Sequence, residues 1–201
     1  PILIGLGLVA FVLLTMWLVR EYLKRYHKDV AENDRLLLLL ALIVILVVLL
    51  TRLLSAIQIT ELPEIDAMIG YLAPVAAGSM LLAILIDNRL AYFITMIMAL
   101  FVGLLTDSNQ LAYATVAFVS GTVGVYRVTR LSQTSDLAKA GFYIAVANVV
   151  TISALIFISG NVTLSLVLAG IVFGIGSGFL SAILMIGALP YLESAFSITS
   201  M

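Results

Sequence analysis

The sequence lacks cysteine entirely and contains a single histidine, His27. Without cysteine the chain cannot form disulfides, thiolate metal sites or cysteine nucleophiles. With one histidine, a histidine-rich metal site cannot be assembled, and because His27 is expected to lie on a solvated surface, we expect no Ser/His/Asp triad either. We therefore expect no catalysis within these 201 residues and no cofactor bound to them.

Charged residues are also scarce. They make up 10% of the chain, against 63% hydrophobic residues, and the mean hydropathy is +1.23. Soluble domains carry about 25% charged residues, so a chain of this size could not cover its apolar surface in water. The sequence predicts a protein embedded in a lipid bilayer. The net charge of −1 gives no argument for nucleic-acid binding, and we expect no nucleic-acid partner.

Seven apolar segments are long enough to cross a bilayer as helices. A crossing needs about 20 apolar residues, with about 17–25 tolerated. Helices are expected rather than barrel strands, because runs such as LLLLLALIVILVVLL show no period of two. The sequence thus predicts an all-α bundle with spans at residues 1–19, 36–56, 67–86, 90–106, 110–126, 140–159 and 162–188.

The distribution of positive charge predicts an orientation. If residue 1 lies outside, the inner loops 20–35, 87–89 and 127–139 hold nine of the ten Lys and Arg residues. Positive residues prefer cytoplasmic loops, so we expect the N-terminus outside and the C-terminus in the cytoplasm. Arg52 is the exception, near the outer end of the second span. It is expected to anchor that helix at the headgroups, with ligand sensing or helix pairing as alternatives.

The two ends of the chain look cut from a longer protein. The sequence starts at Pro1 without a basic n-region, so the run 1–19 is expected to be a membrane helix rather than a signal peptide. At the other end, the apolar pattern stops at Leu189 and a short amphipathic stretch begins without a capping signal.

Small residues indicate close helix packing in two spans. Gly170, Gly174 and Gly178 recur every four residues along one face of the last span, which predicts a packing seam. Pro74 lies early in the third span and is followed by small residues that include Gly78. We expect a kink there, with a cavity or a moving joint as the alternative.

The remaining polar residues have structural interpretations. Asn148 lies in the middle of a span and is expected to bond to a neighbouring helix rather than to a substrate. Asp87 and Arg89 flank a tight polar turn between the third and fourth spans. His27 falls in the basic segment LKRYHKDVAENDR, which we expect to be a solvated cytoplasmic surface near anionic lipid.

Three stretches together resemble one family. They are DVAENDRLLLLLALIVIL (29–46), PVAAGSMLLAILIDNRLA (74–91) and GALPYLESAFSIT (187–199), of which the last is the most specific. The chain resembles the membrane region of the bacterial seven-transmembrane HD phosphodiesterases over nearly all of its length. This resemblance implies an extracellular sensor domain before the region and a cytoplasmic HD-type hydrolase after it, in a protein of the bacterial plasma membrane.

The hydrolase of that family degrades cyclic di-AMP with a bound metal pair held by histidine and aspartate. No position of this sequence corresponds to those ligands, so the metal pair is expected outside these 201 residues. The resemblance also implies that Pro190 ends the last membrane helix. On this interpretation residues 1–189 form the membrane domain, and residues 190–201, with Glu193, start the connector to the enzyme.

Three hypotheses for function follow. The first is a membrane anchor that relays a signal by shifting the seventh helix and the connector. The second is a small transporter or channel, although no charged residue lies near the middle of a predicted span. The third is a passive anchor that forms a homodimer through the glycine face.

Overall fold

The computed structural model describes residues 2–57, 63–106, 109–129 and 135–196, and every regular element within these ranges is helical. The helices are α1 (Ile2–Tyr26), α2 (Lys28–Ala31), α3 (Asp34–Ser55), α4 (Pro63–Ala67), the 3-10 helix η1 (Met68–Leu72), α5 (Val75–Leu85), α6 (Asn88–Leu105), α7 (Gln110–Val128), α8 (Ser135–Ser159) and α9 (Leu164–Phe196).

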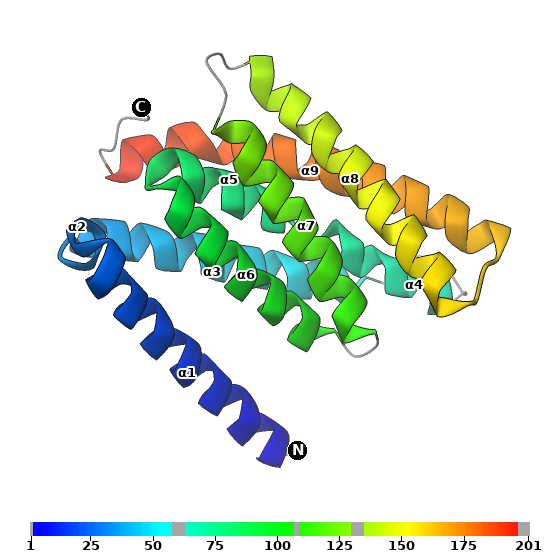
Figure 1. The fold of residues 1–201 in the computed structure, drawn as a ribbon, viewed down its shortest axis with the longest axis horizontal. Coiled ribbons are helices and arrows are strands. Elements are labelled where there is room, and N and C mark those ends of the chain that lie inside the picture. The colour runs from blue at the N-terminus through cyan, green and yellow to red at the C-terminus, as the bar shows by residue number, and fades with distance from the viewer. Residues whose placement is uncertain (1, 58–62, 107–108, 130–134, 197–201) are drawn as a thin grey trace.

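The prediction of seven spans is confirmed. Within the described residues, seven helical segments are long and apolar enough to cross a membrane: Gly5–Tyr26, Asp34–Ser55, Ile65–Leu85, Asn88–Leu105, Gln110–Val128, Ala138–Ser159 and Leu164–Phe196. An odd number of crossings places the two ends of the chain at opposite ends of the bundle. Figure 1 shows this separation, with the end of α9 on the same side as α2.

Helix α5 forms the centre of the bundle. Its sequence VAAGSMLLAIL is apolar all around, as expected of a helix buried on every side. Val75, Ala76, Met80 and Leu82 are fully buried in the core. Helices α3, α6, α7 and α9 all contact α5, while α8 packs outside them against α7 and α9.

Helix α1 diverges from the rest of the bundle (Figure 1). It contacts α6 through side chains, with Tyr22 stacked on Phe93 at a ring-centroid distance of 4.0 Å and Phe11 against Phe101 at 5.5 Å. Most of its other large apolar residues are exposed, as expected of a helix that faces lipid.

The third span is broken rather than kinked. The expected kink at Pro74 is a full interruption, in which η1 ends at Leu72 and α5 begins at Val75. Ala73 adopts φ −47° and ψ 121°, an extended conformation that proline favours in the residue before it. Pro74 is the N-cap residue of α5, where its missing N–H removes no bond from the following helix.

Candidate functional site

The glycines of α9 lie against α8. A Cβ at Gly174 would stand 2.9 Å from the backbone nitrogen of Val149, and one at Gly178 would stand 2.5 Å from that of Ala145. Gly170 meets the side chain of Ile152 in the same way. Such contacts allow the two backbones to approach closely, and packing of this kind drives helix association in lipid. Because α8 of the same chain covers this face, the structure does not support a homodimer through it.

Asn148 joins three helices inside the bundle. Its Nδ2 donates to Ser177 Oγ on α9 at 3.1 Å and to Ser120 Oγ on α7 at 3.4 Å. All three side chains are buried, and among the described residues Asn148 Oδ1 has no hydrogen-bond partner. An amide that donates across two helix interfaces fixes how α7, α8 and α9 sit against one another.

A second polar contact lies between α5 and α6. Thr95 Oγ1 donates to Ser79 Oγ at 2.6 Å, and both side chains are fully buried. Gly121 of α7 packs on this pair, since a Cβ there would meet Thr95 and would lie 2.7 Å from Ser79 Oγ. Gly78, the residue before Ser79, packs on the side chains of Val47 and Ile43 of α3. Small residues therefore bring the central helices together as they do α8 and α9.

Helix α9 continues past Pro190 to Phe196, so the expectation that Pro190 ends the last helix is wrong. A proline removes the bond to the carbonyl four residues earlier, that of Ile186. Both residues are exposed, so the free carbonyl and the ring lie outside the core, and membrane helices tolerate such a proline. Leu192 is buried, and half-buried Glu193 has one carboxylate oxygen without a partner among the described residues.

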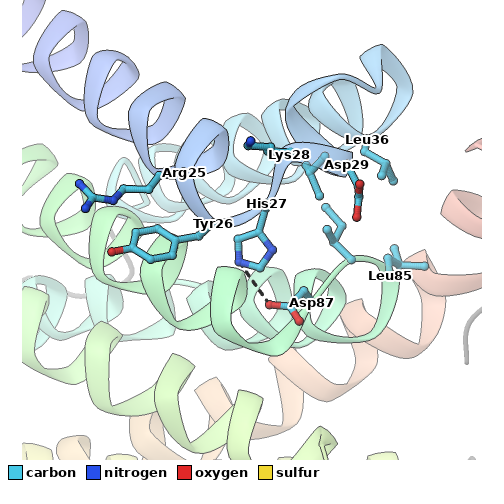
Figure 2. A pocket seen from close by; sticks show the side chains of 10 residues that line it. Arg25, Tyr26, His27, Lys28, Asp29, Leu36, Leu85 and Asp87 are labelled. Atoms are coloured by element: carbon cyan, nitrogen blue, oxygen red, sulfur yellow. Dashed lines mark ion pairs between the residues drawn. The ribbon is translucent and has the colours of Figure 1, made fainter.

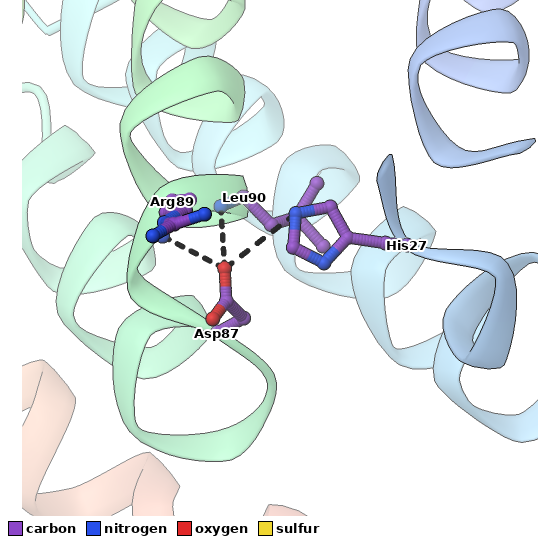
Figure 3. A network of polar contacts seen from close by, with 4 residues as sticks. All are labelled: His27, Asp87, Arg89 and Leu90. Carbon is purple, nitrogen blue, oxygen red and sulfur yellow. Dashed lines mark hydrogen bonds and ion pairs between the residues drawn. The ribbon is translucent and has the colours of Figure 1, made fainter. Parts of the chain in front are cut away.

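A polar cluster joins the α1–α2 elbow to the α5–α6 turn. Asp87 is the N-cap of α6, and its Oδ1 accepts the backbone N–H groups of Arg89 at 2.8 Å and Leu90 at 3.0 Å (Figure 3). His27 Nε2 lies 3.6 Å from the same oxygen, which makes an ion pair when the imidazole is protonated. The carboxylate of Asp87 therefore caps α6 and also faces His27, which lies between α1 and α2.

His27 is not the solvated surface residue that the sequence analysis predicts. Its side chain is 15% exposed and points towards Asp87 across a pocket of about 550 Å³ (Figure 2). The pocket is lined by Arg25, Tyr26, His27, Lys28, Asp29, Val30, Leu36, Leu85, Ile86 and Asp87. The sequence could not show this burial, because it arises only where α1 and the α5–α6 turn meet.

Two further contacts connect helices at this end of the bundle. Thr129 Oγ1, after the end of α7, donates to Asn88 Oδ1 at the start of α6 at a distance of 3.0 Å. The guanidinium of Arg127 lies 3.2 Å from the ring centroid of Tyr143 on α8, a cation–π contact. Side-chain contacts thus link the α1–α2 elbow to α6, α6 to α7, and α7 to α8 at this end of the bundle.

Arg52 pairs two helices at the opposite end. Its Nη1 donates to the carbonyl oxygen of Leu105 at 3.1 Å, in the last turn of α6. Carbonyl groups at a helix C-terminus lack partners within the helix and carry partial negative charge, so a cation there is stabilising. Arg52 therefore joins α3 to α6, which is the helix pairing that the sequence left open as an alternative.

Replacing Asp87 tests which of its two contacts stabilises the fold. Asp87→Ala removes the N-cap acceptor of α6 and is expected to destabilise the protein by about 1 kcal/mol. Asp87→Asn keeps an acceptor for the capped amides and loses only the charge opposite His27. We therefore expect it to lower the stability by only a few tenths of a kcal/mol. Thermal unfolding in detergent at one pH compares the two variants. Equal losses would show that the ion pair, and not the cap, carries the contribution.

Comparison with known families decides the identity of this bundle. The family described as 7TM receptor with intracellular HD hydrolase matches residues 2–200. The chain belongs to this family. As a member of the 7TM receptor–HD hydrolase family, it is a multi-pass protein of the bacterial plasma membrane.

Two curated relatives are similar to the chain. Cyclic-di-AMP phosphodiesterase PgpH of Bacillus subtilis (strain 168) is 29% identical over 138 residues, which is 66% of this chain and 19% of that protein. Cyclic-di-AMP phosphodiesterase PgpH of Listeria monocytogenes serotype 1/2a (strain 10403S) is 27% identical over 135 residues, again 66% of this chain and 19% of that protein. The chain therefore spans about a fifth of the length of these relatives. No solved structure matches it.

The chain corresponds to the membrane domain of the 7TM receptor–HD hydrolase family, and the HD hydrolase lies outside these 201 residues. Among the described residues, no group of three His, Cys, Asp or Glu side chains is placed to hold a metal ion.

Several of these contacts escape sequence analysis. Sequence reasoning singles out Asn148, but nothing in the sequence identifies Ser120 and Ser177 as its partners. Ser79 and Thr95 look like ordinary small polar residues of apolar helices. Their one available signal is the mid-span position, where a hydroxyl must bond either to its own helix or to a neighbour.

Proposed function

We propose that this chain is the membrane-anchoring and signal-relay domain of a receptor-like cyclic di-AMP phosphodiesterase. The observation that carries the proposal is α9, one continuous helix from the α8 seam to Phe196, in a family whose HD hydrolase is intracellular. Two relatives named as cyclic-di-AMP phosphodiesterases support the substrate class. The hydrolase would follow α9, and an extracellular sensor domain would precede α1.

The proposed orientation places the end of α9 in the cytoplasm. Figure 1 shows this end of the helix on the same side of the bundle as α2, which belongs to the segment 20–35 that carries five of the ten Lys and Arg residues. Positive residues favour the cytoplasmic side, so the charge distribution supports a hydrolase attached at that side.

The relay we propose is a rigid shift of α9 between two packings. The Asn148–Ser177 bond and the glycine contacts with α8 define one packing of α9. A continuous helix transmits a shift or rotation along its length, whereas a flexible linker would absorb it. A signal moves such an equilibrium only if it favours one packing over the other. The hydrolase would then respond to the position of α9.

Catalysis and its metal pair are assigned to the hydrolase. The family description names an intracellular HD hydrolase, and that domain lies outside these 201 residues. The hydrolase would supply the metal-bound nucleophile that cleaves the phosphodiester. The role of this chain is to hold that enzyme at the membrane and to bias its activity.

A change of helical register beyond Phe196 tests the relay in the full-length protein. Inserting one alanine there rotates the hydrolase by about 100°, whereas inserting seven rotates it by about 20°, because an α-helix has 3.6 residues per turn. We expect the one-residue insertion to change cyclic di-AMP hydrolysis by about fivefold, a coupling within the usual range. The seven-residue insertion should keep the original activity.

Two results would contradict the proposed function. Equal hydrolysis in both insertions would make the domain a passive anchor, and absence of cyclic di-AMP hydrolysis in the unmodified protein would reject the substrate.

Single cysteines introduced into the chain check the orientation, because these 201 residues contain no native cysteine. In intact cells an impermeant thiol reagent should label Asn161→Cys and leave Lys28→Cys unlabelled.

No observation favours the transporter alternative. The buried polar side chains of the described residues are Thr15, Thr51, Ser79, Thr95, Thr106, Ser120, Asn148, Ser177 and Ser181, and all of them are uncharged. Ion pathways through membrane proteins are commonly marked by charged residues in the bundle interior.

A further inference from the structure

A groove of about 1020 Å³ runs along the bundle between α1 and α3. Its floor is α6, with Ile94, Ile97, Phe101 and Leu105, and its walls carry residues such as Val19 and Val44. The groove exists because α1 packs against α6 through Tyr22 and Phe11 and lies apart from α3. From Leu37 to Arg52, its α3 wall is about 22 Å long at 1.5 Å per residue. Its length and apolar lining suit an extended hydrocarbon chain.

The groove has charge of one sign. Its lining includes Arg20 and Lys24 on α1 and Arg52 on α3, and it includes no carboxylate. Arg52 already donates to the carbonyl of Leu105 at the far end. Among the described residues, Arg20 and Lys24 form no ion pair.

Arg20 and Lys24 form the positively charged end of the groove opposite Arg52. They are four residues apart on one helix, so the two cations lie on the same face, where like charges repel each other. An anion between them would remove that repulsion. Under the proposed orientation this end lies at the cytoplasmic leaflet, where basic pockets between membrane helices bind anionic lipid headgroups.

We propose that the groove between α1 and α3 is a binding site for an anionic phospholipid. The phosphate lies between Arg20 and Lys24, and an acyl chain extends along α6 towards Phe101 and Leu105. The groove is apolar along most of its wall, which favours a lipid over a free phosphate. Its polar end carries only positive charge, which favours an anionic lipid over a second copy of the chain. This inference does not depend on the relay proposed above.

Lipid binding to the delipidated protein, followed by native mass spectrometry, tests the proposal. The probes are phosphatidylglycerol and phosphatidylcholine with identical acyl chains, and inorganic phosphate is the soluble comparison. We expect phosphatidylglycerol to bind more tightly than phosphatidylcholine. In the Arg20→Gln/Lys24→Gln variant this preference should fall by about 10- to 30-fold, because each basic residue contributes about 1 kcal/mol to binding an anionic headgroup.

Arg25→Gln/Lys28→Gln is the matched control for charge. It makes the same change of net charge in the same segment, but its residues line the pocket beside His27 and not the groove. It should keep the preference for phosphatidylglycerol. Ala41→Trp fills the groove and should prevent binding of either lipid, whereas Leu38→Trp, at a residue that is 60% exposed and outside the groove, should leave binding unchanged.

Circular dichroism establishes that each variant is folded before lipid is added. The proposal is overturned if the wild-type protein binds the two lipids equally well, or if the control pair of substitutions removes the preference as completely as Arg20→Gln/Lys24→Gln. It is also overturned if inorganic phosphate binds the protein as tightly as the lipid does, or if Ala41→Trp disrupts a dimer without altering lipid binding.

Discussion

Gly178→Leu is expected to disrupt the packing of α8 on α9 and to lower the stability of the protein by about 3 kcal/mol, or about 10 °C in the unfolding midpoint. A Cβ at this position would lie 2.5 Å from the backbone nitrogen of Ala145 and 2.5 Å from the carbonyl oxygen of Gly141. Both are backbone atoms of α8, so no rotamer change relieves the contact. The helices would have to separate and lose their packing along the seam.

Gly187→Leu is the matched control on the same helix. Apart from its chain neighbours and the local helix backbone, no heavy atom lies within 4 Å of a Cβ at Gly187, so the larger side chain enters open space. Its expected effect is small and stabilising, since glycine in a helix interior costs about 0.5–1 kcal/mol relative to alanine. Heating the purified variants in detergent and following helicity measures both effects. Similar midpoints for the two variants would mean that the α8–α9 contact does not hold the bundle together.

The second large effect is expected at Gly121, in the centre of the bundle. Gly121→Ala adds a methyl group that meets Thr95 and lies 2.7 Å from Ser79 Oγ, and these two side chains are hydrogen-bonded to each other at 2.6 Å. Neither can move away without breaking that bond, and Thr95 is β-branched with few rotamers in a helix. We expect a loss of about 1–3 kcal/mol.

Gly124→Ala provides the comparison, one helical turn further along α7. There the added methyl group would lie 3.1 Å from Cγ of Met80 and 3.4 Å from the carbonyl oxygen of Ala76. Methionine is flexible and can adjust by a few tenths of an ångström. The gain in helix propensity should offset most of the remaining strain, which leaves stability nearly unchanged. If Gly124→Ala is the more damaging variant, the Ser79–Thr95 contact is not the tightest point of the core.

These two sites differ in what they mean for function. The Gly121 contact lies among α5, α6 and α7, the interior of the bundle, whereas Gly178 lies on the helix that continues to Phe196. In the proposed relay, α9 moves against α8 while the central helices stay fixed. Substitutions near Gly174 and Gly178 should therefore alter hydrolysis by the full-length protein, and those at Gly121 should act through stability alone.

The number and positions of the spans were predictable from the sequence. Crossing a membrane depends on the length and hydropathy of one segment, so the seven apolar runs are found as seven candidate spans without knowledge of their neighbours. The spacing of Gly170, Gly174 and Gly178 likewise predicts which face of α9 packs, because a four-residue period is a property of the helix itself.

Partners were not predictable in the same way. The contact of His27 with Asp87 joins residues far apart in the chain, and the basic residues around His27 suggested a solvated surface instead. Pro190 was misread for a related reason. A proline ends a helix when the freed carbonyl has no compensation, and whether it lies outside the core depends on how the whole helix is packed.

The sequence by itself determined that this chain is a seven-span helical membrane protein with its basic residues gathered at one side, because hydropathy and charge act segment by segment. Only the tertiary structure decided which residues meet: the Asn148 bridge, the seam of α8 on α9, the continuous α9 and the groove beside α1. The physical reason is that lipid surrounds every apolar helix face equally well. The choice of partner therefore depends on close packing and on a few polar groups, which the order of residues along the chain does not reveal.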